Sequence, residues 1–403
     1  MLPTIAFSSG NKTVRHIMKK IGLVKKKFLT RERIYLIVDY LLRREKQGKW
    51  TRSIRNEWTE FMKDVDRNVD RLLWELQHEE FAYGDFICFD RIEKGKLRKI
   101  YASHPVDQIV DQLLTDCLYH VLCEVKHIIP PTCYGSIPGK GQHAMRKKII
   151  QLVRGRKDLY VGISDTKQYY PTMVHDLLYK MCEEHIKDKW LLWLCKITIY
   201  RMDGGKGLAL GSPSSNLLGH LYHSELDWKI ILGYKVRRYY RFCDNKFVIH
   251  KDLSYVHTIM RALRDGIEEL GQHMKKDWRV VHCEDERFEC LGSMINSHGA
   301  YMQRKTRRSA EHIMEENIRR QDPAMAMRSW SGIRGTLDSL SITNLLLTWQ
   351  DKYAEFFRLV SVGLRQEKEK KRRRRWHKKL GKILAECPDM RSEENKLKYP
   401  IAV

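Results

Sequence analysis

The stretch from Val236 to His250 reads V-R-R-Y-Y-R-F-C-D-N-K-F-V-I-H, and the interpretation of the whole chain starts from it. Two runs rich in aromatic and β-branched residues lie on either side of the polar pair Asp244-Asn245. This pattern predicts a β-hairpin with its tip at that pair, which would present a carboxylate at the edge of a small sheet. Taken alone, the stretch favours a turn that only reverses the chain.

Composition narrows the classes of partner. The 403 residues include 75 Lys and Arg against 50 Asp and Glu, a formal net charge of +25. Such a chain is long enough for two or three domains, and its charge indicates a polyanionic partner, either nucleic acid or an anionic membrane surface. No run approaches the ~18 apolar residues of a membrane span, and the first residues do not resemble a secretory leader. We therefore expect a nucleic-acid partner, no membrane and a cytoplasmic location.

The ten cysteines are scattered and include no C-x-x-C pair. This spacing predicts neither a zinc site nor a disulfide framework. We expect the cysteines to be small buried apolar residues in a reducing compartment.

Periodicity gives a coarse order of elements. Apolar residues at helical spacing predict helices within 31–80, 104–127, 144–153, 175–184, 190–200, 216–231, 253–270 and 306–359. Short β-prone runs predict a hairpin within 81–101 and strands at 159–165, 278–281 and 288–295. Proline and glycine between residues 128 and 143 predict a loop, and Ser214 or Ser215 is expected to cap the helix that begins at Asn216.

The charge is concentrated near the C-terminus without being confined to it. Residues Arg365 to Lys379 hold ten basic and two acidic side chains, so +8 of the +25 lies there and +17 belongs to the rest of the chain. One interpretation of this tail is an RNA-gripping segment in which Trp376 stacks on a base. The other is a basic tail with no dedicated site.

Two carboxylates carry the candidate chemistry. Asp165 ends the strand predicted at 159–165, Asp244 lies at the hairpin tip, and the glycine-rich stretch Gly207–Asn216 lies between them in the chain. Two carboxylates on one sheet can hold Mg²⁺ together with substrate phosphates. Two such ions can activate a 3′ hydroxyl and stabilise a leaving pyrophosphate. On a basic protein this combination predicts nucleotidyl transfer on nucleic acid.

Seven short motifs in order then resemble bacterial reverse transcriptases. They are K-L-R-K-I (Lys96–Ile100), C-Y-G-S-I-P-G-K-G-Q-H (Cys133–His143), S-D-T-K-Q-Y-Y-P-T-M (Ser164–Met173), G-L-A-L-G-S-P-S-S-N (Gly207–Asn216), F-C-D-N (Phe242–Asn245), E-C-L-G (Glu289–Gly292) and R-S-W-S-G (Arg328–Gly332). In that family they correspond to the fingers hairpin, the template-side loop, the first catalytic motif, the nucleotide-binding loop, the aromatic-x-Asp-Asp hairpin, the primer grip and a thumb element.

The resemblance implies an α+β right-hand polymerase, with fingers, a palm built on a small antiparallel sheet, and an α-helical thumb. Its expected parts are a basic lead-in (1–30), N-terminal helices and fingers (31–157), palm (158–298), thumb (299–360) and a basic C-terminal tail (361–403). Leu210 before Gly211, and Ser215-Asn216 in place of Ser-Gln, look most like the reverse transcriptases of diversity-generating retroelements. Defence-associated bacterial reverse transcriptases of unclassified groups are almost as similar.

Residue roles follow from the same resemblance. Asp165 and Asp244 would bind Mg²⁺, or Mn²⁺ in its place, with the backbone carbonyl of Thr166 as a further ligand. Tyr170 would be the steric gate that prefers deoxynucleotides. The remaining nucleotide-binding residues would be Lys96, Arg98, Leu210 and Gly211. Because Leu210 cannot supply a directional hydrogen bond, base discrimination would be poorer than with the glutamine of other reverse transcriptases.

Two further positions leave alternatives open. Lys275 or Lys276 would be the acid that protonates pyrophosphate, or the two are a surface lysine pair. Asn245 stands where the family has a second catalytic aspartate, so it keeps an oxygen but loses a charge. We therefore expect weakened metal affinity, and the alternative is a catalytically weakened paralogue that acts as a scaffold.

The function expected from the resemblance is an RNA-directed DNA polymerase acting in antiviral defence or in a retroelement. Its partners would be a template or non-coding RNA, a DNA product and dNTPs, with an accessory protein or a second reverse transcriptase as an additional partner. An RNA-dependent RNA polymerase shares the metal chemistry but fits Tyr170 poorly.

Overall fold

Helices and small antiparallel sheets make up the chain. The computed structural model describes residues 23–45, 51–93, 96–340 and 342–386, without the side chains of 45, 91–93, 96–98, 343 and 377–386. It divides into two compact units, one formed by 1–145 and 156–286 and the other by 146–155 and 287–403. The predicted polymerase subdomains stay a prediction, and most of the predicted lead-in lies outside the described residues. Among the described residues, no helix has the length and apolar content to cross a membrane.

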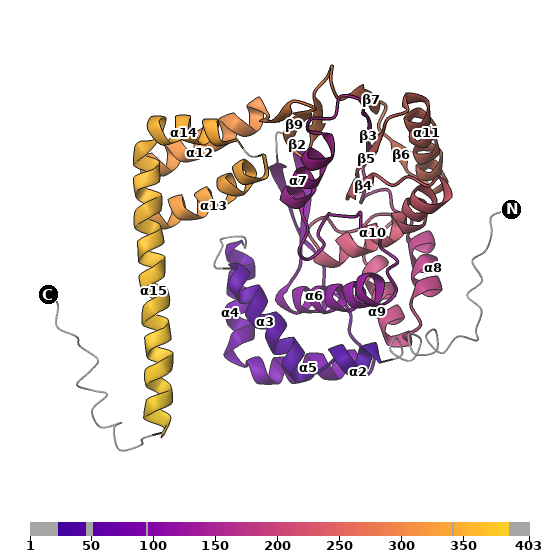
Figure 1. Cartoon of the computed structure of the whole chain (residues 1–403). Coiled ribbons are helices and arrows are strands. Elements are labelled where there is room, and N and C mark those ends of the chain that lie inside the picture. The colour runs from indigo at the N-terminus through magenta and orange to yellow at the C-terminus, as the bar shows by residue number, and fades with distance from the viewer. Residues whose placement is uncertain (1–22, 46–50, 94–95, 341, 387–403) are drawn as a thin grey trace. The chain divides into compact units, whose positions relative to one another are not determined.

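The first unit begins with short helices packed around a buried one. They are α2 (Val24–Phe28), α3 (Arg31–Glu45), α4 (Arg52–Lys63) and α5 (Val65–Gln77), followed later by α6 (Pro105–Tyr119). Helices α3 to α5 lie within the predicted 31–80 and α6 within 104–127, whereas α2 lies in the predicted lead-in and was not foreseen. Helices α3 and α4 both contact α6 (Figure 1). In α4, Thr51 caps the first turn by accepting a hydrogen bond from the Ile54 amide at 3.3 Å. Ile54, Trp58 and Phe61 then recur at helical spacing and are buried.

The predicted hairpin within 81–101 is formed by β1 (Ile87–Glu93) and β2 (Lys96–Ala102), which pair antiparallel. Its first strand begins later than expected, because the backbone at Gly84 is held by side chains instead of a strand partner. The amide of Gly84 donates to Asp107 at 3.4 Å, and its carbonyl accepts from Arg201 at 2.8 Å. Arg201 also forms a buried ion pair with Asp107 at 2.6 Å.

A five-stranded antiparallel sheet is the centre of the first unit. Its order is β4-β5-β3-β6, and β7 also pairs with β3. The strands are β3 (Tyr160–Lys167), β4 (Tyr239–Phe242), β5 (Asn245–His250), β6 (His273–Met274) and β7 (Arg279–His282). Strand β3 runs two residues beyond Asp165, where it was predicted to end. Helix α11 (Leu253–Glu269) packs closely on this sheet, since a Cβ at Gly162 would lie 2.6 Å from the sulfur of Met260.

The other helices of the first unit match the predicted ones to within a few residues. They are η1 (His120–Val125), α8 (His175–His185), α9 (Lys189–Ile199), α10 (Pro213–Trp228) and η2 (Lys229–Gly233), where η marks a π-helical turn. Helix α7 (Gln142–Val153) lies where the two units meet in the chain. One detail was wrong: α10 begins at Pro213, so Ser214 and Ser215 lie inside its first turn and Ser212 is the N-cap. Proline fits the first helical position because its missing N–H has no helical partner there.

The second unit combines a small sheet with long helices. The strand predicted at 288–295 is two strands, β8 (Phe288–Cys290) and β9 (Ser293–Asn296), because Leu291 and Gly292 both take positive φ and turn the chain. Strand β10 (Gly299–Met302) pairs with β9. The helices are α12 (Arg304–Arg320), α13 (Pro323–Leu340), α14 (Thr343–Lys352) and α15 (Ala354–Glu386).

Helix α15 is one continuous helix that crosses the predicted start of the C-terminal tail at residue 361 (Figure 1). Its first part packs on α13 so closely that a Cβ at Gly363 would lie 2.2 Å from the Pro323 carbonyl oxygen. Beyond it, the described side chains from Leu364 to Trp376 are mostly exposed. The basic run is therefore presented on a helix.

Candidate functional site

The hairpin of the opening stretch exists, but its tip lies one residue earlier than predicted. Phe242 pairs with Asn245, so Cys243 and Asp244 form the turn and Asn245 begins β5. Cys243 has a φ of 51°, in the left-handed region that a two-residue hairpin turn requires. The pair Asp244-Asn245 is polar, but the turn is set by the register of the strands that flank it. Asp244 therefore projects from the turn itself.

Strand pairing brings the two predicted carboxylates together. Asp165 on β3 pairs directly with Asn245 on β5, the neighbour of Asp244. The Thr166 amide donates to the Asp244 carbonyl at 3.2 Å, and Thr166 itself is buried. Asn245 donates its side-chain amide to Asp244 Oδ1 at 3.0 Å. The four residues Asp165, Thr166, Asp244 and Asn245 thus form one cluster at the edge of β3 and β5.

Burial and repulsion between the two carboxylates of this cluster both make it harder for Asp244 to be charged. Burial raises the pKa of Asp244, and the neighbouring negative charge of Asp165 raises it further. Oδ1 of Asp165 is buried and has no hydrogen-bond partner, although a carboxylate oxygen is a strong acceptor. An unsatisfied carboxylate oxygen beside a second carboxylate is a donor set that suits a hard divalent cation.

Two lysines lie against these carboxylates. Lys275 forms an ion pair with Asp165 Oδ2, and its amide donates to the Asp165 carbonyl at 2.9 Å. Lys246 is fully buried, and its ammonium donates to Thr166 Oγ1 at 2.8 Å. Burial lowers the pKa of Lys246 to about 8, and the charge of Arg241 lowers it as well. The sequence analysis named Lys275 or Lys276 as the proton donor to pyrophosphate. Lys275 lies beside Asp165, whereas Lys276 is exposed.

Asp165 and Asp244 are two carboxylates, fewer than the ligands a metal site made of protein groups alone would need. Among the described residues, a group of three His, Cys, Asp or Glu ligands within reach of one ion occurs at Glu184, His185 and Glu225, where both glutamates are exposed. The predicted site offers two carboxylates and the Thr166 carbonyl. Two carboxylates with substrate phosphates are a sufficient set for Mg²⁺, so the residues present fit this ion. The metal assignment stays a proposal.

A buried ion pair that the sequence analysis did not predict links the hairpin to helix α10. Arg241 and Asp227 are both 0 % exposed, and their closest atoms, Nη2 and Oδ2, are 2.6 Å apart. Arg241 also donates to the Tyr169 hydroxyl at 3.0 Å and to the Cys243 carbonyl at 3.2 Å. It thereby links helix α10, the segment after β3 and the turn that carries Asp244. The signal in the sequence is an arginine at the centre of an aromatic run.

The proline- and glycine-rich loop docks beside this hairpin. The Tyr134 amide donates to the Arg241 carbonyl at 2.9 Å, and the Arg241 amide donates to the Thr132 carbonyl at 3.1 Å. Gly135 is required here because a Cβ would lie 2.4 Å from Cys243 Sγ. The loop therefore extends the sheet edge next to the turn.

The nucleotide-binding loop predicted from the sequence lies against the segment after β3. The Leu208 amide donates to the Tyr170 carbonyl at 3.1 Å, and the Tyr170 hydroxyl donates to Asn216 Oδ1 at 2.6 Å. Gly211 has a φ of 114°, which favours glycine. The carbonyl of Leu210 accepts from the Tyr101 amide at 3.5 Å, so the loop meets the end of β2.

Lys96 and Arg98 lie on β2, but their side chains fall outside the described ones. By register they are opposite Glu93 and Arg91 on β1. The structure places the hairpin that carries them against the loop that contains Leu210.

A buried aspartate supports the same loop from the helix side. Asp111 of α6 is 2 % exposed and accepts a hydrogen bond from the Ser214 hydroxyl at 3.0 Å. Ser214 in turn shares a hydrogen bond of 2.8 Å with Ser212, the N-cap of α10. Burial raises the pKa of Asp111 to about 6, and Arg201 opposes that rise. The sequence analysis predicted the helix that contains Asp111 and gave this residue no role.

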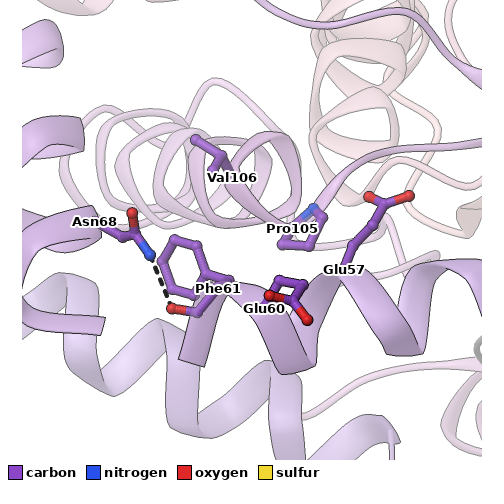
Figure 2. A pocket seen from close by; sticks show the side chains of 6 residues that line it. All are labelled: Glu57, Glu60, Phe61, Asn68, Pro105 and Val106. Carbon is purple, nitrogen blue, oxygen red and sulfur yellow. Dashed lines mark hydrogen bonds between the residues drawn. The ribbon is translucent and has the colours of Figure 1, made fainter. Parts of the chain in front are cut away.

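A separate pocket lies among the N-terminal helices and contains none of the predicted site residues. Figure 2 shows its lining side chains, which come from α4, α5 and the start of α6: Glu57, Glu60, Phe61, Asn68, Pro105 and Val106. Asn68 donates to the Phe61 carbonyl at 2.9 Å, and Glu57 accepts from the His104 ring at 2.7 Å. These polar groups are thus engaged in holding the helices together.

Comparisons with known proteins add little. No family model and no curated protein matches this sequence. Among solved structures, the chain is similar to telomerase from Candida albicans, solved in complex with the TWJ fragment of telomeric RNA. The identity is 10 %, the TM-score is 0.45, and the match covers 71 % of this chain and 56 % of that chain. The chain therefore spans little more than half of that relative, and a likeness at this level carries no argument about function.

Proposed function

We propose that this chain is an RNA-directed DNA polymerase. The observation that carries the proposal is the pairing of β3 with β5, which sets Asp165 beside Asp244 with one carboxylate oxygen unsatisfied. The proposal also rests on the ordered motifs that resemble bacterial reverse transcriptases. The basic composition supports a nucleic-acid substrate.

In this proposal, Asp165, Asp244 and the Thr166 carbonyl hold Mg²⁺ or Mn²⁺ with the help of substrate phosphates. The bound ions supply activation of the primer 3′ hydroxyl and stabilisation of the leaving pyrophosphate. Lys275, adjacent to Asp165, is placed to give a proton to pyrophosphate. Tyr170, Leu210 and Gly211 form the deoxynucleotide pocket, and Lys96 and Arg98 contact the triphosphate.

The direct test is primer extension by the purified full-length chain on an RNA template with dNTPs and Mg²⁺ or Mn²⁺. Wild type is expected to extend the primer, and Asp165→Asn and Asp244→Asn are expected to abolish extension. Asp265→Asn is the matched control, because Asp265 is an exposed residue of α11 whose ion-pair partner among the described residues is its neighbour Arg264. Wild type that makes no DNA with either metal would falsify the polymerase assignment. Preferential use of ribonucleotides would instead indicate an RNA-dependent RNA polymerase.

A second candidate is a scaffold that binds RNA or another polymerase without catalysis. Asn245 in place of a carboxylate favours it, as does the pairing of Asp165 with Lys275. This candidate predicts RNA binding that is unchanged by Asp165→Asn, together with no extension by wild type.

A role in antiviral defence or in a diversity-generating retroelement belongs to the polymerase proposal. A template repeat beside a variable gene would support the retroelement, and neighbouring defence genes or a second reverse transcriptase would support immunity.

A further inference from the structure

The far end of the Tyr170 side chain is held by Asn216 and also lies beside the Cys243 thiol. Its hydroxyl donates to Asn216 Oδ1 at 2.6 Å. The Asn216 amide nitrogen faces the Pro213 carbonyl oxygen at 3.5 Å, so the amide oxygen is the atom turned toward Tyr170. Asn216 lies in the first turn of α10, and Pro213 is the first residue of that helix. The hydroxyl of Tyr170 is therefore tied to a rigid element.

The rest of Tyr170 is held by its surroundings. Its ring packs edge-on against Tyr169, with centroids 5.0 Å apart and planes at 79°. Its carbonyl accepts a hydrogen bond from Leu208 in the same stretch that contains Asn216. Tyr169 is itself buried and bonded to the Gly219 carbonyl at 2.7 Å, so it offers a fixed wall. The Tyr170 hydroxyl therefore bonds to Asn216, with the Cys243 side chain as a second polar neighbour.

We infer that Asn216 is a positioning residue that sets sugar discrimination through Tyr170. The inference rests on the proposed function, in which Tyr170 excludes a ribose 2′ hydroxyl. A ring that excludes one atom works only where its edge is held to within a fraction of an ångström. The hydrogen bond to Asn216 restrains the ring at the point farthest from the backbone, where a small rotation moves the edge most. Loss of that bond admits ribonucleotides while the catalytic carboxylates stay in place.

The test compares incorporation of dNTP and rNTP by wild type, Asn216→Leu, Tyr170→Phe and the double variant. The measured quantity is the ratio of kcat/KM for dNTP to kcat/KM for rNTP. Loss of one hydrogen bond predicts a ratio about fivefold to tenfold lower in Asn216→Leu. Tyr170→Phe removes the same bond from the other side, together with the contact to Cys243, so the double variant is expected to match Tyr170→Phe alone. Additive effects in the double variant, or an unchanged ratio in Asn216→Leu, would overturn the inference.

Controls separate positioning from general damage. The ratio is measured within one preparation, so a reduced fraction of active enzyme cancels. Asn68→Leu removes a hydrogen bond of the α4–α5 region and is expected to leave the ratio unchanged. Asn216→Gln keeps an amide oxygen and is expected to recover most of the lost discrimination; a Gln variant as poor as the Leu variant contradicts the hydrogen-bond account. If Asn216→Leu does not fold, Asn216→Ala serves in its place.

Failure of this inference is distinct from failure of the proposed function. Wild type that incorporates neither nucleotide removes both. Wild type that is active and selective, with variants at Asn216 equally selective, removes only the role of Asn216.

Discussion

At the scale of single residues, Asn245 is the position where this site departs most from its resemblance. It donates its amide to Asp244, whose pKa is already raised by burial and by Asp165. A third carboxylate there would add repulsion to a confined cluster, and a divalent cation would relieve that repulsion.

Asn245→Asp is therefore expected to lower the Tm in the presence of EDTA and to gain more Tm than wild type from millimolar Mg²⁺. Thermal unfolding with and without Mg²⁺ measures both effects without any assay of activity. Asn344→Asp, an exposed change on α14, should show neither effect. An equal Mg²⁺-dependent gain in wild type and Asn245→Asp would count against a metal site at this position.

Asp111 gives a second residue-scale prediction, on pH. Its pKa is raised by burial from an ordinary 3.8 to about 6, so between these values the folded state binds more protons than the unfolded state. The stability that this proton contributes is complete below pH 3.8 and is lost as the pH rises through 6.

Asp111→Asn removes that dependence. Relative to wild type, the variant should gain stability by up to about 3 kcal/mol between pH 3.8 and pH 7. Urea unfolding at the two pH values measures the change, with the exposed Asp265→Asn as control. A difference between Asp111→Asn and wild type that is the same at both pH values would contradict it.

At the scale of elements, the hairpin that carries Asp244 depends on the buried pair of Arg241 and Asp227. Both side chains are 0 % exposed, so removal of the anion leaves a guanidinium with no water to solvate it. Asp227→Asn should cost about 3 to 5 kcal/mol in the free energy of unfolding, measured in urea. The exposed pair of Arg264 and Asp265 is the control, because its loss should cost at most about 1 kcal/mol. Similar losses at the two pairs would show that the buried pair does not hold the hairpin.

The same elements show what the sequence could predict. Helical spacing located the helices from Arg31 to Gln77 because their buried faces are regular, and the hairpin at Val236–His250 was found from its two β-prone runs. Its tip was misplaced by one residue, because a cysteine with positive φ carries no turn signal in its identity. The break of the strand predicted at 288–295 was missed for the same reason at Leu291.

The candidate site was predicted in part for a comparable physical reason. Asp165 and Asp244 were paired from strand ends and a resemblance, and the register places them together. Arg241 and Asp227, which support the hairpin, and Asp111, which supports the loop that contains Leu210, were not foreseen as partners because their contacts join different elements of the fold. A charged residue is expected to be exposed unless a partner is known that would compensate its burial, and the sequence does not show that partner.

At the scale of the whole molecule, a net charge of +25 predicts that binding to the proposed RNA partner weakens steeply with salt. Helix α15 allows a matched test. Lys371 pairs with Glu367 at 3.7 Å and Arg373 with Glu369 at 2.8 Å, whereas Lys368 and Arg372 form no ion pair among the described side chains.

Lys368→Gln with Arg372→Gln is expected to weaken RNA binding and to reduce the slope of log K against log salt by about 1 to 2. Lys371→Gln with Arg373→Gln removes the same charge from cations that already have partners, so it should have a smaller effect. Equal losses in the two double variants would indicate that only total charge matters. No loss in either would place the RNA surface elsewhere in the chain.

The continuity of α15 changes what its basic run means for binding. A flexible tail of the same composition would lose conformational entropy each time it bound RNA, and this loss would weaken the affinity. In α15 the residues after the close contact of Gly363 with Pro323 are already helical, so less freedom is lost on binding. The cations from Arg365 to Arg375 are spread over about 15 Å of a stiff rod. Cations fixed on a helix are preorganised for one arrangement of phosphates. We therefore expect base-paired RNA to bind more tightly than flexible single-stranded RNA of equal charge.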